Sequence, residues 1–194
     1  MKLTLPCMFI VGTVYLAAVA GCATDSGSSK QRTPFGGAPH TIPGMIEAEH
    51  YDEGPPGIAY SDVDEENQGV DYRGSTQVDI EKRDDASNGH GVGWTRAGEW
   101  LAYSVHVQSS GTYSIEFPVA SAGPGGIFHV ALDGIDVTGP ITVPDTGGWG
   151  TLKMIRVDGV KLESGDQVLT MVMESAGESG SIGDIDYMRF TKTL

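Results

Sequence analysis

The feature that most constrains the fold is a series of short apolar segments separated by turns. Seven segments are rich in Val, Ile, Tyr and Phe, and several alternate apolar with polar residues, as half-buried strands do. They span 45–49, 100–107, 112–119, 127–132, 154–157, 168–173 and 185–190. Glycine-containing turns stand between them, and the sequence has no sustained helical pattern and no tandem repeat. The pattern predicts an all-β sandwich or barrel.

The N-terminus has the pattern of an export signal. Lys2 is the only ionisable side chain before Asp25, and a mostly apolar run extends from Leu3 to Ala20. This run is marginal for a membrane-spanning helix, which needs about 20 apolar residues, and suits a signal peptide. It ends in Val-Ala-Gly-Cys22, which resembles the lipobox of bacterial lipoproteins. We therefore expect a signal peptide at 1–21 and a lipidated Cys22. An ordinary secretory signal with an incidental cysteine is the alternative.

The domain organisation follows from the residues after Cys22. Cys7 would leave with the signal, so the exported chain would hold one cysteine and no internal disulfide. Residues 22–43 are rich in Ser, Gly and Pro and predict a flexible linker, and 44–194 predict one domain. Ala23 after the cysteine favours the bacterial outer membrane or cell surface, by analogy with enterobacterial sorting.

The charge of the chain excludes one class of partner. Lys and Arg number 12 against 26 Asp and Glu, which gives a net charge of −14, or −15 once Lys2 is removed with the signal. A surface this acidic repels phosphate backbones and anionic lipid. We expect no nucleic-acid partner, and contact with a membrane only through the lipid anchor.

Motifs spread over residues 46–191 resemble a family 6 carbohydrate-binding module. They are Ile46-Glu-Ala-Glu-His-Tyr51, Gly57 to Asp62, Asp71-Tyr-Arg73, Val78-Asp-Ile80, Val92-Gly-Trp-Thr95, Ala97 to Tyr103, Thr138 to Ile141, Thr146-Gly-Gly-Trp149 and Asp184 to Phe190. No single motif is diagnostic, but their order and spacing make a strong match. The resemblance implies a jelly-roll β-sandwich of the galactose-binding-like type, found appended to polysaccharide-degrading enzymes. It implies non-catalytic binding of a polysaccharide or oligosaccharide such as β-1,3-glucan, an agarose-type galactan or xylan.

Paired carboxylates point to a cation or an arginine. Glu47 and Glu49 lie two apart on a predicted strand, so both project from one face, where they repel unless a positive charge lies between them. Spacing alone allows a solvated or arginine-paired arrangement as well as a hard cation such as calcium. The resemblance implies structural calcium held by Glu47, Glu49 and Asp186, with Asp186 on a last strand beside the first.

Aromatic residues are the second set of candidates. Sugar rings stack on flat aromatic faces. Trp149, in a Thr-Gly-Gly-Trp-Gly loop, is difficult to bury, and Trp94 ends a strand. The resemblance implies that these two rings enclose one sugar. Trp100 is expected in the core, which is where tryptophans of β domains most often lie.

Polar candidates complete the predicted site. The resembling family has an asparagine where this chain has Asp184, and an ionised aspartate only accepts hydrogen bonds. The loop 57–79, which carries Tyr60 and Tyr72, is long enough to indicate a function. The resemblance implies that it closes one end of the cleft, where Tyr60 and Tyr72 would contact sugar. A solvated acidic loop or a second cation site is an equal alternative.

Two other classes of function remain open. A small glycoside hydrolase needs two carboxylates about 5–10 Å apart beside a cleft, and this chain has many acids. However, it has no nucleophile elbow, no phosphate loop, no zinc spacing and no metal-ligand pattern among its histidines, so we expect no enzyme. The third class is a structural surface lipoprotein that binds no sugar. A partner glycoside hydrolase is compatible with the resemblance, but the sequence does not identify one.

Overall fold

The computed structural model describes residues 31–193. The predicted signal peptide and Cys22 lie outside these residues. Within 31–193, no helix is long and apolar enough to span a membrane.

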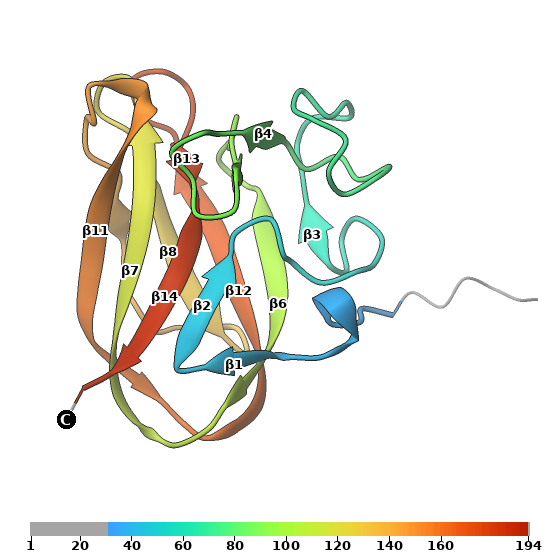
Figure 1. The fold of residues 1–194 in the computed structure, drawn as a ribbon, viewed down its shortest axis with the longest axis vertical. Helices are drawn as coiled ribbons and strands as arrows, with labels where there is room; N and C mark the ends of the chain where they lie inside the picture. The colour runs from blue at the N-terminus through green and yellow to red at the C-terminus, as the bar shows by residue number, and fades with distance from the viewer. Residues whose placement is uncertain (1–30, 194) are drawn as a thin grey trace, which may run out of the picture.

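Two β-sheets form the body of the domain (Figure 1). The first sheet has the order β1 (His40–Ile42), β6 (Trp100–Val107), β12 (Gly165–Ser175), β8 (Ile127–Leu132), β10 (Ile141–Thr142), with β3 (Tyr60–Ser61) on β6 and β9 (Ile135–Asp136) on β8. The second has the order β2 (Gly44–Glu47), β14 (Tyr187–Lys192), β7 (Gly111–Ser121), β13 (Asp184–Ile185), β5 (His90–Val92), β4 (Ile80–Lys82), with β11 (Gly148–Leu162) on β7. All seven predicted strands are present, and the predicted jelly-roll β-sandwich is confirmed.

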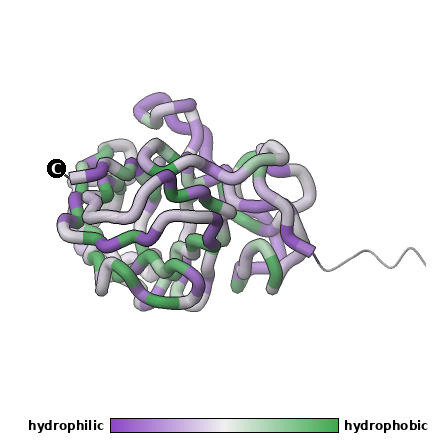
Figure 2. Tube along the Cα trace, turned by 90° about the horizontal axis from the view of Figure 1, so that it is seen from below, coloured by the Kyte–Doolittle hydropathy of each residue, from purple (hydrophilic) through white to green (hydrophobic). Residues whose placement is uncertain are grey.

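The core lies between the sheets and explains the alternating pattern. Along β6, Leu101, Tyr103, Val105 and Val107 are buried, and along β7, Tyr113, Ile115, Phe117 and Val119 are buried. Phe117 meets Phe128 of β8 edge to face, with ring centroids 5.2 Å apart. Figure 2 shows hydrophobic and hydrophilic residues alternating along the chain. Each sheet therefore turns one face inward and the other to solvent.

The linker prediction is wrong for residues 33–43. Thr33 bridges to Glu53, a 3-10 turn η1 covers Phe35–Gly37, and β1 pairs in parallel with β6. Ile42 is fully buried in the core cluster. The Gly and Pro content of this segment suggested a flexible chain. Composition does not show, however, that the free edge of β6 can hydrogen-bond to an extended neighbouring segment.

Trp100 does not lie in the core. Leu101 and Tyr103 of β6 face inward, so Trp100 falls on the outer face of the sheet, where it is half-buried. The strand period of two residues decides this. The sequence located the strand correctly but assigned Trp100 to the wrong face.

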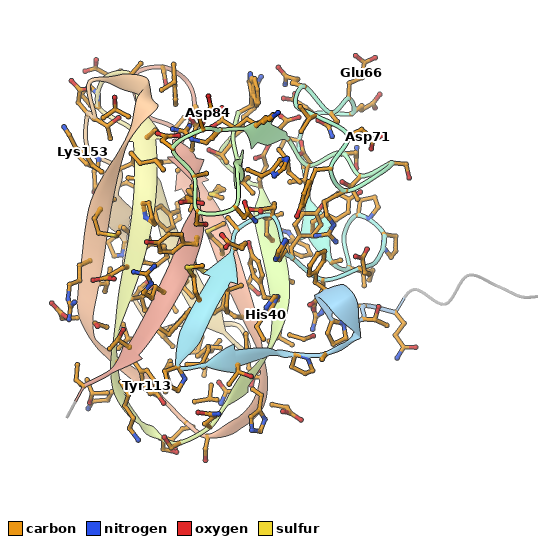
Figure 3. All side chains as sticks on the ribbon, in the orientation of Figure 1. His40, Glu66, Asp71, Asp84, Tyr113 and Lys153 are labelled. Carbon is orange, nitrogen blue, oxygen red and sulfur yellow. The ribbon has the colours of Figure 1, made fainter. Side chains whose placement is uncertain are left out.

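The loops gather at one end of the sandwich. The end of β7, the start of β11, β13 and β4 meet at the upper end in Figure 1. Figure 3 shows Asp84, which follows β4, and Glu66, in the loop between β3 and β4, at this end, whereas Tyr113 lies at the other. Chain segments far apart in sequence therefore contribute side chains to one surface.

Candidate functional site

A cleft of about 460 Å³ opens at the loop end of the sandwich. We call it the tryptophan cleft. Its lining comes from four separate stretches of chain: Glu81, Trp94, Arg96, Trp149, Ser179, Gly180, Ser181 and Asp184.

The two tryptophans predicted to bind ligand both line this cleft. Trp94 is 41% exposed and Trp149 is 38% exposed, which is unusual for side chains this large and apolar. Trp94 has a φ of +48°, in the left-handed region that bulky residues avoid. Such backbone strain often marks a binding site. Trp149 follows Gly147 and Gly148, whose φ values of +92° and +144° require glycine.

Arg83 organises the floor of the tryptophan cleft. Its side chain is almost fully buried and donates from Nη1 to Asp184 Oδ2 over 2.9 Å and to Glu81. Nε and Nη2 donate to the two oxygens of Asp85 over 2.9 and 3.0 Å, and Nη2 also donates to the carbonyl oxygen of Trp149 over 2.7 Å. A single guanidinium thus connects the floor to the Trp149 wall.

Asp184 lines the cleft as predicted, but it does so as part of a buried ion pair. It is 4% exposed. Burial, and then the charge of Glu81, raise the pKa of Asp184 above the usual aspartate range, against the opposing effect of Arg83. A Cβ added at Gly93 would lie 3.2 Å from Asp184 Oδ1, so glycine there keeps the space beside the carboxylate open.

The loop 57–79 reaches the cleft through Asp64. Its Oδ2 lies 2.7 Å from Nε of Arg96, a lining residue. Val63, also in this loop, lies 3.8 Å from the position of a Cβ on Gly98. The loop therefore contacts the Arg96 side of the cleft.

The two tyrosines predicted from this loop are not in the tryptophan cleft. Tyr60 is 3% exposed, in the core, and packs edge to face on Tyr51 with centroids 5.6 Å apart, so its prediction as a sugar contact is wrong. It lies on β3, which pairs with β6, and this pairing turns the ring inward. Tyr72 is half-buried between His50 and His90, and its hydroxyl lies 3.0 Å from His50 Nε2.

A buried acidic cluster lies beneath the same loop. Glu99 accepts hydrogen bonds from the backbone nitrogens of Arg96, over 2.8 Å, and Val63, over 3.5 Å. Burial, and the neighbouring Asp62 and Asp79, raise the pKa of Glu99 to about 7. Burial also raises the pKa of Asp62 to about 6.

Glu47, Glu49 and Asp186, the predicted calcium ligands, each accept a hydrogen bond from Ser87 or Asn88. Tyr187 of β14 pairs with Glu47 of β2, which places the last strand beside the first. Ser87 Oγ donates to Glu47 Oε2 over 2.6 Å and to Asp186 Oδ1 over 3.0 Å, and Asn88 Nδ2 donates to Glu49 Oε1 over 2.5 Å. Burial, with mutual repulsion, raises the pKa of Glu49 to about 7.

The donor chemistry of these three carboxylates fits a hard cation. Glu49 Oε2 is buried without a hydrogen-bond partner, which is costly unless something else contacts it. Oxygen atoms are the donors that calcium prefers. In the positions that the side chains of 31–193 occupy here, no three acidic, histidine or cysteine residues surround a single metal-sized space.

Sequence reasoning missed Glu81, Arg83 and Arg96. A signal was present for the first two: Glu81-Lys-Arg83 stands directly before Asp84 and Asp85, which is an unusual density of opposite charges. Nothing in the sequence indicated that β4 and β13 would bring Arg83 within reach of Asp184, 101 residues away.

Comparisons with known proteins show the family of this domain. Residues 68–192 match the family model "Carbohydrate binding module (family 6)". The alpha subunit of clotting factor G from Tachypleus tridentatus is 33% identical over 127 residues, which are 64% of this chain and 18% of that protein. This chain thus spans less than a fifth of that relative.

Solved structures show the same fold. A β-1,3-glucan-binding family 6 module from Bacillus halodurans superposes with a TM-score of 0.60 and 25% identity, over 79% of this chain and 98% of the other. A family 6 module from Cellvibrio mixtus lichenase 5A, in complex with cellotriose, superposes with a TM-score of 0.57 and 27% identity, over 79% of this chain and 99% of the other. The chain therefore belongs to family 6 of the carbohydrate-binding modules, a family of non-catalytic binding modules.

Proposed function

We propose that the tryptophan cleft binds a polysaccharide or oligosaccharide, with one sugar ring stacked between Trp94 and Trp149. The observation that carries this proposal is that two tryptophans, each more than a third exposed, line one cleft above a floor of carboxylates. Aromatic faces bind the C–H faces of sugars, and nearby polar groups fix the hydroxyls.

The hydrogen-bonding partners follow from the lining. Glu81 and Asp184 can accept from sugar hydroxyls, and Ser181 also lines the cleft. Because Arg83 holds both carboxylates and the Trp149 carbonyl, the site is organised before ligand arrives. Pre-organisation reduces the entropy lost on binding.

A β-glucan is our first candidate ligand. The Bacillus halodurans module is described as binding β-1,3-glucan, and the Cellvibrio mixtus module was solved with cellotriose. Agarose-type galactan and xylan belong in the same screen. Binding by a non-catalytic protein would position a polysaccharide for a partner glycoside hydrolase.

Affinity electrophoresis in laminarin, lichenan, agarose and xylan gels tests this function, with bovine serum albumin as the reference for unretarded migration. Trp149→Ala should weaken binding at least about tenfold, because stacking on an aromatic contributes about 1–3 kcal/mol. Ile135→Ala is the control, since Ile135 is 70% exposed and outside the cleft. If folded Trp149→Ala binds as wild type does, the site is elsewhere, and the outer sheet face that carries Trp100 becomes the next candidate.

We also propose structural calcium at Glu47, Glu49 and Asp186. The support is the unpartnered Glu49 Oε2, the bridge that Ser87 makes between Glu47 and Asp186, and the bond from the adjacent Asn88 to Glu49. When bound, calcium would neutralise these carboxylates and tie β2 to the segment between β13 and β14. It would have no part in contacting sugar.

The membrane anchor remains a proposal from sequence. Cys22 should be lipidated, which would tether the domain to a bacterial outer membrane or cell surface. Cys22→Ser should move the protein from the membrane fraction to the soluble one, or leave its signal uncleaved. Identical fractionation of both forms would contradict the anchor.

A further inference from the structure

The buried guanidinium at the floor of the tryptophan cleft has no hydrogen-bond donor to spare. A guanidinium has five N–H donors. In Arg83, all five are used: one on Glu81, one on Asp184, two on Asp85 and one on the carbonyl oxygen of Trp149. The cation at the floor of the cleft therefore has no donor left for a ligand.

Acceptors remain at the same floor. Arg83 donates to Oε1 of Glu81 and to Oδ2 of Asp184, and the two carboxyl groups also hydrogen-bond to each other. The Glu81 side chain is 20% exposed and lines the cleft, against 6% for Asp184. Glu81 is thus the carboxylate that a sugar can approach most directly.

The charges around the floor are unbalanced. Three carboxyl groups, on Glu81, Asp85 and Asp184, contact one guanidinium. Even with Asp184 protonated, as its raised pKa favours, the other two carry more charge than the guanidinium neutralises. The other cation of the lining, Arg96, is 47% exposed and already paired with Asp64. An anionic group placed between the tryptophans would lie beside carboxylates with no free buried cation to neutralise it.

We propose that the tryptophan cleft selects sugars by charge, with Glu81 as the specificity-determining residue. It binds sugars that donate hydrogen bonds, favours a protonated amino sugar over its neutral counterpart, and excludes uronic acids and sulfated sugars. This inference rests on the proposed function, because it names the class of sugar held between Trp94 and Trp149.

Two interactions favour the ammonium group. It can donate to Glu81 as a charge-assisted hydrogen bond, which is stronger than one from a neutral hydroxyl. It also lies against aromatic faces, which attract cations. A carboxylate or sulfate group makes neither of these two interactions and is repelled by the Glu81 carboxylate.

The test uses three trisaccharides of one linkage: a neutral sugar, its amino counterpart and its uronic acid counterpart. Isothermal titration calorimetry with the full-length protein at pH 6 and low salt measures each dissociation constant. We expect the amino sugar to bind at least about threefold tighter than the neutral sugar, and the uronic acid to bind at least about tenfold weaker than the neutral sugar. Effects of this size are expected from one close, partly buried charge contact with Glu81.

Two variants separate a local effect from the overall charge of the chain. Glu81→Gln should narrow the ratio between amino-sugar and acid affinities at least about fivefold, since it removes one close charge. Glu163→Gln removes the same charge just beyond the far end of β11 and should leave the ratio unchanged.

Each result has a defined meaning. If the acid binds as tightly as the neutral sugar, or if Glu81→Gln and Glu163→Gln give the same ratio, charge selection is wrong while sugar binding stands. A wild-type protein that binds none of the three contradicts the proposed function, and this inference with it.

Discussion

Arg83 donates to the carbonyl oxygen of Trp149 over 2.7 Å, across 66 residues of sequence. Together with the ion pair to Asp184, this bond makes the position of the Trp149 wall depend on the buried Arg83 side chain. Arg83 need not contact the ligand itself. Lysine has three donors on one nitrogen and cannot reach four separate partners.

Arg83→Lys should therefore lower both stability and affinity. Disrupting a buried ion pair costs about 3–5 kcal/mol when one partner is removed outright, and a lysine should recover part of that. Urea unfolding and calorimetric titration measure the two effects. Adding Asp184→Asn to Arg83→Lys should restore stability, because it removes the uncompensated carboxylate, but should not restore the Trp149 wall. An Arg83→Lys protein that melts and binds as wild type would show that Arg83 has no positioning role.

Trp94 can be tested for strain as well as for binding. Both Trp94→Ala and Trp94→Gly should lose sugar affinity, because each removes a stacking face. With φ at +48°, however, the glycine variant avoids the roughly 1–2 kcal/mol that an L-residue loses in the left-handed region. Trp94→Gly should thus be no less stable than Trp94→Ala in urea, despite the greater freedom of its unfolded chain. A markedly less stable glycine variant would argue against strain at this position.

Calcium removal should lower the melting temperature and leave sugar affinity at 25 °C intact. A ligand that binds only the folded state stabilises it by mass action. Differential scanning calorimetry with EDTA, and then with calcium restored, measures the shift, and Glu49→Gln should abolish it. Metal analysis of the purified protein identifies a tightly held ion, so an unshifted melt of metal-free protein would contradict the site.

The loop 60–73 should favour chain ends by closing one end of the tryptophan cleft. Its contact with the lining is the pair between Asp64 and Arg96. Short oligosaccharides should then compete better than the same mass of polysaccharide, because they offer more ends. Asp64→Ala should reduce this advantage. Equal potency by mass in the wild type would mean that the cleft binds chain interiors.

Glu99 should make stability fall as pH rises towards 7. Its pKa is raised by burial from 4.5 to about 7, so the folded state binds more protons than the unfolded state between these values. The contribution of Glu99 to the free energy of unfolding therefore falls as pH rises from about 4.5 to 7, by about 3 kcal/mol in all. Above pH 7 this contribution no longer changes. Glu99→Gln should flatten this part of the unfolding profile relative to wild type. Profiles that run parallel would show that Glu99 does not titrate in this range.

Much of the fold was predictable because β-strands have a recognisable local sequence pattern. The two-residue period identified all seven longer strands, and glycines at turns separated them. The short strands β1, β3, β4, β9 and β10 were missed, since two or three residues are too few for a period. Their pairing partners, rather than their own residues, determine that they are extended.

For the site, residue type, neighbouring glycines and strand spacing indicated which side chains are hard to bury and which carboxylates project from one face. Trp149, Glu47 and Glu49 were identified in this way, whereas Trp94 was assigned from the family resemblance. The packing of the two sheets established that Tyr60 and Trp100 lie on faces other than those predicted, and that Arg83 joins Glu81, Asp184 and Trp149. The physical reason is that exposure and strand period are local properties, whereas the face that a strand buries and the partner that a buried charge finds depend on how the two sheets pack.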